Sequence, residues 1–379
     1  MNLKGGAVSD SPLAQPSCVD TATELESEEQ LSTRMNAIYT IKKIVAFVAL
    51  LLLVIFALDA MVTSGLKNLR TTRFGSWNQA LQGLVNAKIV VSGSSRAASH
   101  YDPEIIREAT GQSTFNLGRN GSQTDIELAI LETYLEHNAA PEIIVHNLDA
   151  FSFVTTREIY DLALYIPYLR ERSLYGRLSQ IKGDIWKSRY LPMYGYVVED
   201  LNFTWLLGLQ SFFHLASGTQ NLLGFDPRTT QWTEDFGKFR RSNPKGVSWE
   251  IEPAGLTAVE GIIQLCKARG IQLILVYSPE YLEMQEITRN RREIFAEFHS
   301  LSSRYQVPFW DYSTWPHSSD TGYFANSQHL NAFGAEQFSN DLAKRLAAHI
   351  NGEKSQASAS GKELGGTQDS SPVPESINK

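Results

Sequence analysis

The sequence predicts an α/β protein, a doubly wound parallel sheet of five strands, preceded by one membrane-spanning helix. From residue 87 to about residue 350, short apolar runs alternate with helical stretches, a pattern typical of parallel sheets covered by helices on both faces. The runs 143–145 and 273–276 are continuously apolar, as expected for strands buried on both sides. A separate apolar run, residues 44–62, has the roughly 20 residues that cross a bilayer.

Composition excludes several classes of protein. The 379 residues carry a net charge of −7 and are 42% hydrophobic, which is enough for a sizeable core. This charge, without a dense basic patch, argues against nucleic acid as a partner. Cys18 lies in a polar segment and Cys266 in an apolar helical stretch, so a disulfide between them is not expected. No Cys and His cluster has ligand spacing, and we therefore predict no metal and no cofactor.

The N-terminal region divides into a tail and an anchor. Residues 1–36 are polar and acidic, which predicts a disordered tail. Residues 42–64 contain the apolar run and predict a transmembrane helix. A cleaved signal peptide fits poorly, because a long tail precedes the run and no small-residue cleavage site is obvious. The flanking Lys and Arg are balanced, so the positive-inside rule does not decide the orientation. The pair Lys42-Lys43 favours the tail inside and an extracytoplasmic domain at the membrane.

The predicted domain covers residues 86–350. Its strands are predicted at 87–92, 114–118, 142–148, 271–277 and 307–311, and its helices at 66–85, 103–110, 124–138, 255–269, 285–304 and 332–350. Residues 151–253 form an aromatic-rich insertion, expected to be helical. Its aromatic side chains could line a groove for sugar rings, although packing against the domain or the membrane surface is the favoured interpretation. Residues 352–379 are rich in Ser, Gly and Pro and predict a second disordered tail.

A serine turn follows the first predicted strand. Gly93-Ser94-Ser95 follows the apolar residues 89–91 after one intervening residue, Ser92, and the next helix is predicted to begin near Pro103. Ser95 would therefore stand at the carboxyl edge of the sheet, where open α/β sheets bind ligands. On its own this stretch fits an ordinary turn better. The remainder of the sequence favours a nucleophile.

A serine nucleophile needs a base and a group that orients the base. His329 lies in a polar loop after the last strand and returns to the same sheet edge, so it is the candidate base. The orienting position, three residues earlier, holds Asn326. An amide can hold an imidazole tautomer but supplies no charge. Asp311 or Asp320 could supply that charge instead, and Asp311 is preferred because it ends the last strand, although an ordinary cap explains it equally well.

An oxyanion hole needs N–H donors that face the developing negative charge. Residues 116–121 follow the second strand and include two glycines, which allow backbone N–H groups to approach a ligand closely. Gly121 is the candidate donor together with the N–H of Ser95, and Gly118 is the turn residue. A plain turn between a strand and a helix explains the same glycines about equally well.

Together, Gly93-Ser94-Ser95, Asn116 to Gly121 and Asn326-x-x-His329 resemble the spaced blocks of the SGNH (GDSL-like) hydrolase family over most of residues 87–350. The similarity is closest to the membrane-anchored branch of alginate-acetylation and teichoic-acid D-alanylation proteins. The resemblance implies a flavodoxin-like five-strand sheet. It further implies Ser95 as nucleophile, His329 as base, Gly121 as oxyanion donor, and a domain that acts on acyl esters of glycans.

Three positions depart from the family pattern. The turn contains Ser94 where the family has Asp, and Asn326 replaces the Asp before the histidine. The family's Asn after the third strand has no clean counterpart, and Asn147, Asp149 and Ser152 remain alternatives.

Two functions follow from these observations. The first is a membrane-anchored serine esterase or O-acyltransferase that acts on a surface or extracellular polysaccharide. The alternative is a catalytically weak or inactive SGNH-like scaffold that binds a glycan or a membrane acyltransferase partner. The expected partners are the bilayer, an acylated glycan and a membrane O-acyltransferase. A nucleotide site is not expected, because the serine turn lacks the glycine spacing and the lysine of a phosphate loop.

Overall fold

The structure is a computed structural model that describes residues 18–200, 202–218, 223–233 and 235–364. The chain divides into two compact units, residues 1–58 and residues 59–379. The first unit contains most of one long helix, α1 (Cys18–Asn68), and the second contains the last ten residues of α1 and all other elements.

A five-strand parallel sheet forms the centre of the second unit. Its order is β2-β1-β3-β4-β5, the flavodoxin-like order of doubly wound sheets, and this confirms the predicted fold class. The strands are β1 (Ile89–Ser92), β2 (Thr114–Asn116), β3 (Ile143–Leu148), β4 (Gln272–Tyr277) and β5 (Phe309–Asp311). The chain reverses its winding direction between β1 and β3, and ligands of such sheets bind at this switch point.

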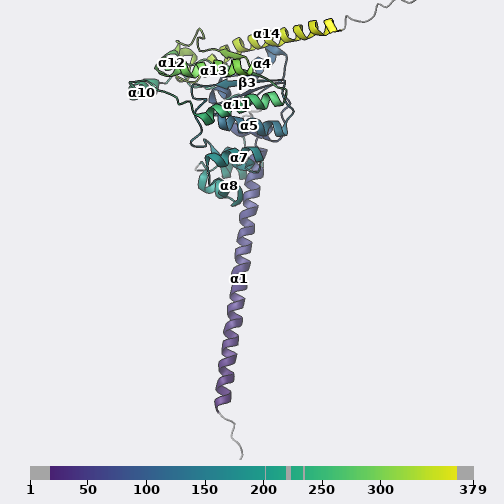
Figure 1. The fold of residues 1–379 in the computed structure, drawn as a ribbon. Coiled ribbons are helices and arrows are strands. Elements are labelled where there is room, and N and C mark those ends of the chain that lie inside the picture. The colour runs from purple at the N-terminus through teal and green to yellow at the C-terminus, as the bar shows by residue number, and fades with distance from the viewer. Residues whose placement is uncertain (1–17, 201, 219–222, 234, 365–379) are drawn as a thin grey trace, which may run out of the picture. The chain divides into compact units, whose positions relative to one another are not determined.

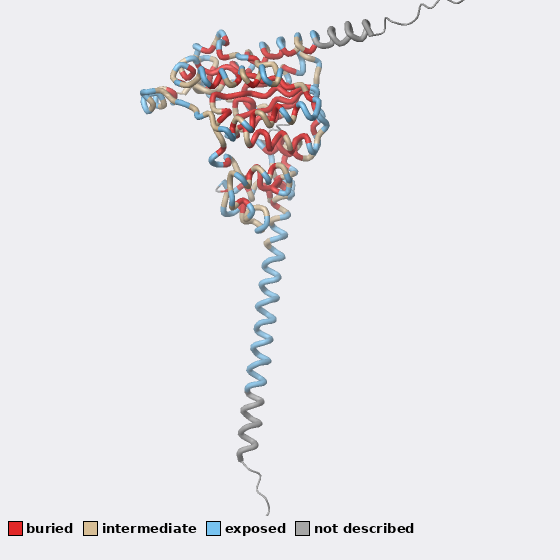
Figure 2. The backbone as a smooth tube through the Cα atoms, in the orientation of Figure 1, coloured by how far each residue is buried: buried red, intermediate tan, exposed pale blue. Residues whose placement is uncertain are grey.

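Alternate strand residues enter two separate cores, because successive side chains of a strand point to opposite faces. Ile89 and Val91 join the core beneath one helical layer, whereas Val90 joins the core beneath the other. The first layer contains α3 (Ser95–His100), α4 (Pro103–Thr110) and α14 (Ala332–Leu364). The second contains α5 (Thr124–His137), α11 (Pro253–Ala268) and α13 (Arg291–Tyr305). Figure 1 shows β3 between α4 and α11, and Figure 2 shows that the strands in the middle of this unit are buried.

The insertion after β3 is helical, as predicted. Within the described residues it contains α6 (Leu162–Tyr165), α7 (Arg172–Ile181), α8 (Trp186–Tyr190), α9 (Thr204–Phe212) and α10 (Asp235–Ser242), with a 3-10 helix at Ile166–Tyr168 and a π-helix at Gly195–Glu199. The remaining elements are α2 (Thr72–Leu81), α12 (Leu282–Ile287) and a 3-10 helix at Thr321–Tyr323.

Helix α1 is long and apolar enough to cross a membrane over Gln30–Asn68, and its most apolar stretch is unburied. Residues of α1 that belong to the second unit are instead packed into it, since Val62 and Leu66 are fully buried. The helix therefore joins an apolar segment directly to the folded domain.

The two predicted tails are wrong in part. Residues 18–36 belong to α1, and residues 352–364 belong to α14. The first segment contains four Glu and the second contains two each of Glu, Lys and Ala. These residues favour helix, and each segment extends a helix that has already formed. The rest of the predicted tails, residues 1–17 and 365–379, lies outside the described residues.

The helix after the serine turn begins earlier than predicted. Helix α3 starts at Ser95 itself because Ser94 caps it, accepting a hydrogen bond from the N–H of Arg96 at 3.2 Å. Helix α4 then begins at Pro103, with Asp102 accepting from the N–H of Glu104 at 2.9 Å. Proline disfavours helix at the residue before it, which separates the two helices. The helix predicted at 66–85 is shorter, and that at 285–304 divides into α12 and α13.

Candidate active site

The serine turn presents a single side chain at the sheet edge. Gly93 has φ +136°, and a Cβ there would lie 3.0 Å from the side chains of Ala97 and Asn147, so this position requires glycine. Along residues 89–101, only Ser95 is not fully buried. The fold therefore exposes its hydroxyl at the carboxyl end of β1.

The structure brings Ser95 and His329 together. The Ser95 Oγ lies 2.7 Å from the His329 Nε2, within the range that proton transfer requires. His329 lies in a loop closed by a bridge between Phe324 and Leu330 and by the Ala325 N–H, which donates to the His329 carbonyl at 2.9 Å. Residues 234 positions apart in sequence thus meet at one edge.

Asn326 orients the imidazole. Its Oδ1 lies 3.0 Å from His329 Nδ1 and accepts the backbone N–H groups of Gln328 and His329, both at 3.0 Å. Backbone N–H groups can only donate, so the side-chain oxygen must face them. The same oxygen can only accept from Nδ1. Nδ1 therefore carries the proton, and the Nε2 lone pair faces the serine hydroxyl, as a general base requires.

The electrostatic surroundings keep this imidazole neutral. Burial, followed by the positive charges of Arg228 and Arg96, lowers the pKa of His329 to about 3. A neutral imidazole can accept the serine proton at neutral pH. The imidazolium formed by that transfer lacks a carboxylate partner at Nδ1, so it is less stabilised than in a triad that contains an acid.

Asp311, the predicted substitute acid, is not brought into the site. Its carboxylate accepts the N–H of Ser313 at 2.7 Å and caps the turn after β5. Asp320 accepts the N–H of Gly322 at 2.8 Å and caps a 3-10 helix. Asn326 already occupies the hydrogen-bonding position at Nδ1, which is why neither carboxylate orients the ring.

The predicted oxyanion loop packs against the serine turn. Arg119 N–H donates to the Gly93 carbonyl at 3.0 Å. Gly118 packs closely against α3, because a Cβ at this position would lie 2.4 Å from the Ala98 nitrogen. The Gly118 N–H donates to Asn116 Oδ1 at 2.9 Å. Gly121 is exposed with φ +70°. The Ser95 N–H lies in the first turn of α3, where N–H groups have no acceptor within the helix. The oxyanion role of these two donors stays a prediction.

The three alternatives for the missing asparagine all have partners elsewhere. Asn147 accepts from the Tyr101 hydroxyl at 2.7 Å and donates to Asp149 at 3.0 Å. Asp149 forms an ion pair with Arg96 at 3.1 Å. Ser152 Oγ accepts the Asp149 N–H at 2.8 Å. These residues stabilise the end of β3.

Arg96 is a buried cation beside the nucleophile that sequence reasoning missed. In addition to its ion pair with Asp149, its guanidinium donates to the carbonyl oxygens of Ser278 and Pro279 and lies 4.7 Å from the Tyr277 ring centroid. These contacts fix α3 to the ends of β3 and β4. In the sequence, this role of Arg96 was indicated by its position directly after Ser95.

His100, which the sequence analysis did not select, supports the loop of the base. It is fully buried on α3. Its Nε2 accepts the Leu330 N–H at 3.0 Å, so its Nδ1 donates to Ser278 Oγ, also at 3.0 Å. Burial and the charge of Arg96 hold the pKa of His100 well below its usual range. Because α3 also carries Ser95, this contact fixes the loop of His329 relative to Ser95.

Arg228 connects the insertion to the site. It donates to Asn120 Oδ1 at 2.8 Å, and Asn120 in turn donates to Asp226 at 3.0 Å. The Ala332 N–H, at the start of α14, donates to the Arg228 carbonyl at 2.8 Å. The insertion therefore contributes a positive charge close enough to lower the pKa of His329.

A cavity of about 840 Å³ begins at the oxyanion loop. Gly118, Arg119 and Asn120 form one side, and insertion residues that include Tyr160 and Tyr165 form another. Neither Ser95 nor His329 lines it. The cavity thus lies beside α3 and the predicted oxyanion loop, and its volume is that of an ordinary small-molecule site.

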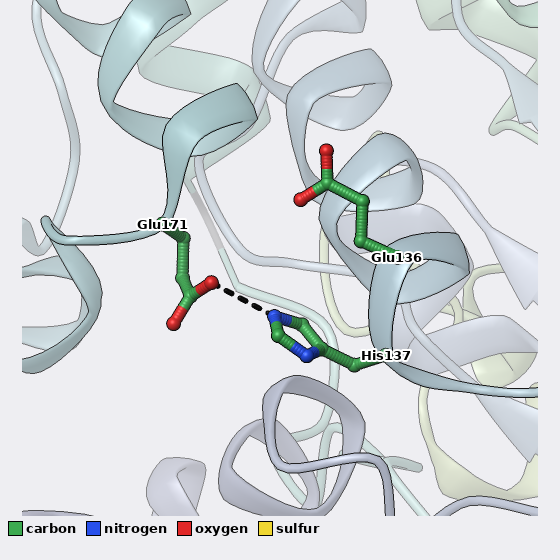
Figure 3. Close-up of side chains that lie close together, drawn as sticks. All are labelled: Glu136, His137 and Glu171. Carbon is green, nitrogen blue, oxygen red and sulfur yellow. Dashed lines mark hydrogen bonds and ion pairs between the residues drawn. The ribbon is translucent and has the colours of Figure 1, made fainter.

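One surface group has side chains of the types that bind metals. Within the described residues, Glu136, His137 and Glu171 offer ligand atoms within 4.8 Å of one another. Figure 3 shows the contact between His137 Nε2 and Glu171, which measures 2.8 Å. The group is largely exposed, and this ion pair accounts for His137 without a metal.

No protein-family model matches the chain, and a search of curated proteins finds no relative. Among solved structures, the chain is similar to a predicted acylhydrolase from Bacteroides fragilis, at 12% identity and a TM-score of 0.34, over 69% of this chain and 86% of that one. It is similar to a GDSL-like lipase from Bacteroides thetaiotaomicron at 11% identity and a TM-score of 0.32, over 69% and 88% of the two chains. The likeness is too remote to bear on activity.

Proposed function

We propose that this chain is a membrane-anchored serine esterase or O-acyltransferase of the SGNH type, acting on acyl esters of a surface or extracellular polysaccharide. The observation that carries the proposal is the 2.7 Å contact between Ser95 Oγ and His329 Nε2, with Nδ1 held by Asn326 at 3.0 Å. A nucleophile, its base and an orienting group in hydrogen-bonding contact are the arrangement that nucleophilic acyl transfer needs.

The reaction follows from these contacts. His329 Nε2 accepts the hydroxyl proton as Ser95 Oγ attacks the ester carbonyl. The N–H groups of Ser95 and Gly121 are the proposed donors to the oxyanion, and the charges of Arg96 and Arg228 favour it. Collapse breaks the bond to the alcohol, which leaves with the proton from His329. Water then releases the acyl group from Ser95 in an esterase, and a sugar hydroxyl accepts it in a transferase.

Asn326 limits the rate without blocking the chemistry. Replacing the triad carboxylate by an amide costs roughly 10⁴ in turnover in the best-studied serine protease, where the tautomer is also wrong. Here two backbone N–H groups fix the amide so that the productive tautomer is favoured. Only the charge is missing, which favours a slow enzyme over an inactive scaffold.

A glycan is the proposed substrate because of the adjoining cavity. Tyr160 and Tyr165 line it together with Arg119, Asn120 and Asp226. Aromatic faces with a few convergent polar groups suit a sugar ring, which has apolar faces and hydroxyl edges.

The proposed anchor is α1. The apolar window within Gln30–Asn68 is unburied, as a helix surrounded by lipid would be. An N-terminal signal sequence has a similar length and composition, so extraction of membranes with alkaline carbonate is the direct test. A retained full-length chain supports the anchor, and a released chain would contradict it.

The activity test uses the full chain in lipid nanodiscs with a chromogenic acetyl ester. We expect turnover that is lost in Ser95→Ala, and labelling by a serine-directed phosphonate that requires both Ser95 and His329. Ser303→Ala is the matched control, because Ser303 is exposed on α13, and it should leave both signals unchanged. Absence of labelling in the unmodified chain over a broad pH range would favour the scaffold instead.

A further inference from the structure

Exposed apolar side chains gather on the part of the insertion formed by the π-helix, α9 and the turn after α9. We define the apolar collar as Val197, Val198, Phe203, Leu206, Phe213 and Leu215. Phe203 is 64% exposed and Leu215 is 72% exposed. Scattered apolar residues on a surface are normal, whereas large apolar patches mark interaction sites. All six of these residues fall within positions 197–215.

The segment that carries the collar is packed on the second-unit part of α1. A Cβ at Gly65 would lie 1.8 Å from the Gly208 carbonyl oxygen, so α1 and α9 cross in direct backbone contact, as small residues allow between membrane helices. Thr63 Oγ1 lies 2.8 Å from the Tyr196 hydroxyl. These contacts fix the collar to the end of α1.

One contact lies at the end of the apolar run itself. The Met193 N–H donates to Asp59 Oδ1 at 2.7 Å, and Asp59 directly follows the unburied residues of α1. A helix rises 1.5 Å per residue, so residues 59–63 of α1 span only a few ångströms. If the run lies in a bilayer, the segments packed on these residues must lie at its surface.

The chemistry of the region suits a lipid interface. Trp186 and Tyr190 are exposed on α8, which contacts the π-helix of the collar, and aromatic residues concentrate at membrane interfaces. Residues 170–199 contain six Lys or Arg against three Asp or Glu, whereas the whole chain carries −7. Basic segments near a membrane are attracted to anionic headgroups.

The backbone conformation at Phe203 also keeps this aromatic side chain exposed to solvent. Phe203 has φ +54°, a left-handed conformation that is uncommon for bulky residues. The Thr204 N–H donates to Asp200 at 2.7 Å and stabilises this turn. A strained residue that exposes a phenyl ring to water points to a use for that ring.

We propose that the apolar collar is a bilayer-docking surface, which enters the interface of the membrane that holds α1. This inference rests on the membrane anchor proposed above and is independent of the catalytic chemistry. Its consequence is that the domain lies against the lipid surface and does not swing freely on α1.

The test uses the full chain in vesicles of phosphatidylcholine and phosphatidylglycerol, with Cys18→Ser and one environment-sensitive fluorophore. Leu215→Cys and Val198→Cys carry the probe on the collar, and Leu282→Cys, 40% exposed on α12, is the control. We expect brominated lipids to quench both collar probes at least severalfold more than the control. The double variant Phe203→Asp, Phe213→Asp should reduce the quenching of both.

The outcomes separate the two proposals. Collar probes that are no more quenched than Leu282→Cys, in a chain that carbonate does not extract, would overturn docking and leave the anchor. Extraction of the chain by carbonate would overturn the anchor and docking together. A blue-shifted collar probe without lipid quenching would indicate a covering protein and would also overturn the inference.

Discussion

The side-chain oxygen of Asn326 serves three N–H groups, and this one atom determines how His329 works. It sets the tautomer of the imidazole and supplies no charge to stabilise the imidazolium. Burial, followed by the positive charges of Arg228 and Arg96, lowers the pKa of His329, and no carboxylate at Nδ1 opposes this shift. The site is built to keep its base neutral.

Replacing the amide of Asn326 by a carboxylate should therefore raise esterase activity. Asn326→Asp places a carboxylate at Nδ1, which stabilises the imidazolium formed during attack. We expect turnover of an acetyl ester to rise at least about tenfold, within the roughly 10⁴ that a triad carboxylate can contribute. The pKa of His329 should rise with it.

Asp311→Asn is the control for that experiment, because Asp311 caps a turn and does not touch the ring. It should leave turnover unchanged. If Asn326→Asp gave no gain while the chain remained folded, charge at Nδ1 would not be what limits the rate.

The pH dependence follows from the same pKa. His329 must be neutral to accept a proton, and a pKa lowered to about 3 keeps it neutral until the solution is strongly acidic. We expect the rate of phosphonate labelling to show no histidine protonation step between about pH 5 and about pH 8. A half-maximal rate near pH 6.5 would contradict this assignment of the base. In Asn326→Asp the protonation step should move upward in pH.

The crossing of α1 and α9 shows how packing between elements depends on glycine. Gly65 and Gly208 bring the two backbones together, and a Cβ at Gly65 would overlap a carbonyl oxygen at 1.8 Å. Overpacking of this kind cannot be relieved by rotating a side chain.

Gly65→Ala should destabilise the domain by about 1–3 kcal/mol, the usual cost of overpacking. Thermal unfolding of the full chain measures this as a lower Tm. Gly176→Ala is the matched control, because nothing lies within 4 Å of a Cβ at that position in α7. A helical alanine there should be neutral or slightly stabilising. Equal Tm values for the two variants would show that the crossing is not tight.

Sequence patterns were sufficient to predict the strands, but they were insufficient to predict the hydrogen-bonding partners of several site residues. All five strands and their parallel arrangement follow from apolar runs that alternate with helices, because the local pattern decides burial. The flavodoxin-like character of the sheet came from the family resemblance. The partner of His329 Nδ1 does not follow, because Asn326 and Asp311 are equally plausible until the loop at 324–330 is closed. The roles of Arg96 and His100 depend on which strand ends meet α3. The ends of α1 and α14 were missed because a disorder-like composition also favours helix.

At the level of the complete chain, the orientation in the membrane is open to direct measurement. We expect a membrane-impermeant maleimide to label Leu282→Cys in intact cells, and to label native Cys18 only after lysis. Cys266 should stay unlabelled, because it is fully buried and burial raises the pKa of its thiol to about 12. The reverse pattern for positions 18 and 282 would place the domain inside.

The hydrogen bond from Arg228 to Asn120 connects the insertion to the loop after β2. A shortened protein without residues 151–253 could retain Ser95 and His329, yet it would lose a cation beside the base and one wall of the adjoining cavity. Under the proposed function, trimming the chain would thus discard part of the proposed substrate site, and any engineering of this scaffold has to treat the insertion and the Ser95-His329 pair as one unit.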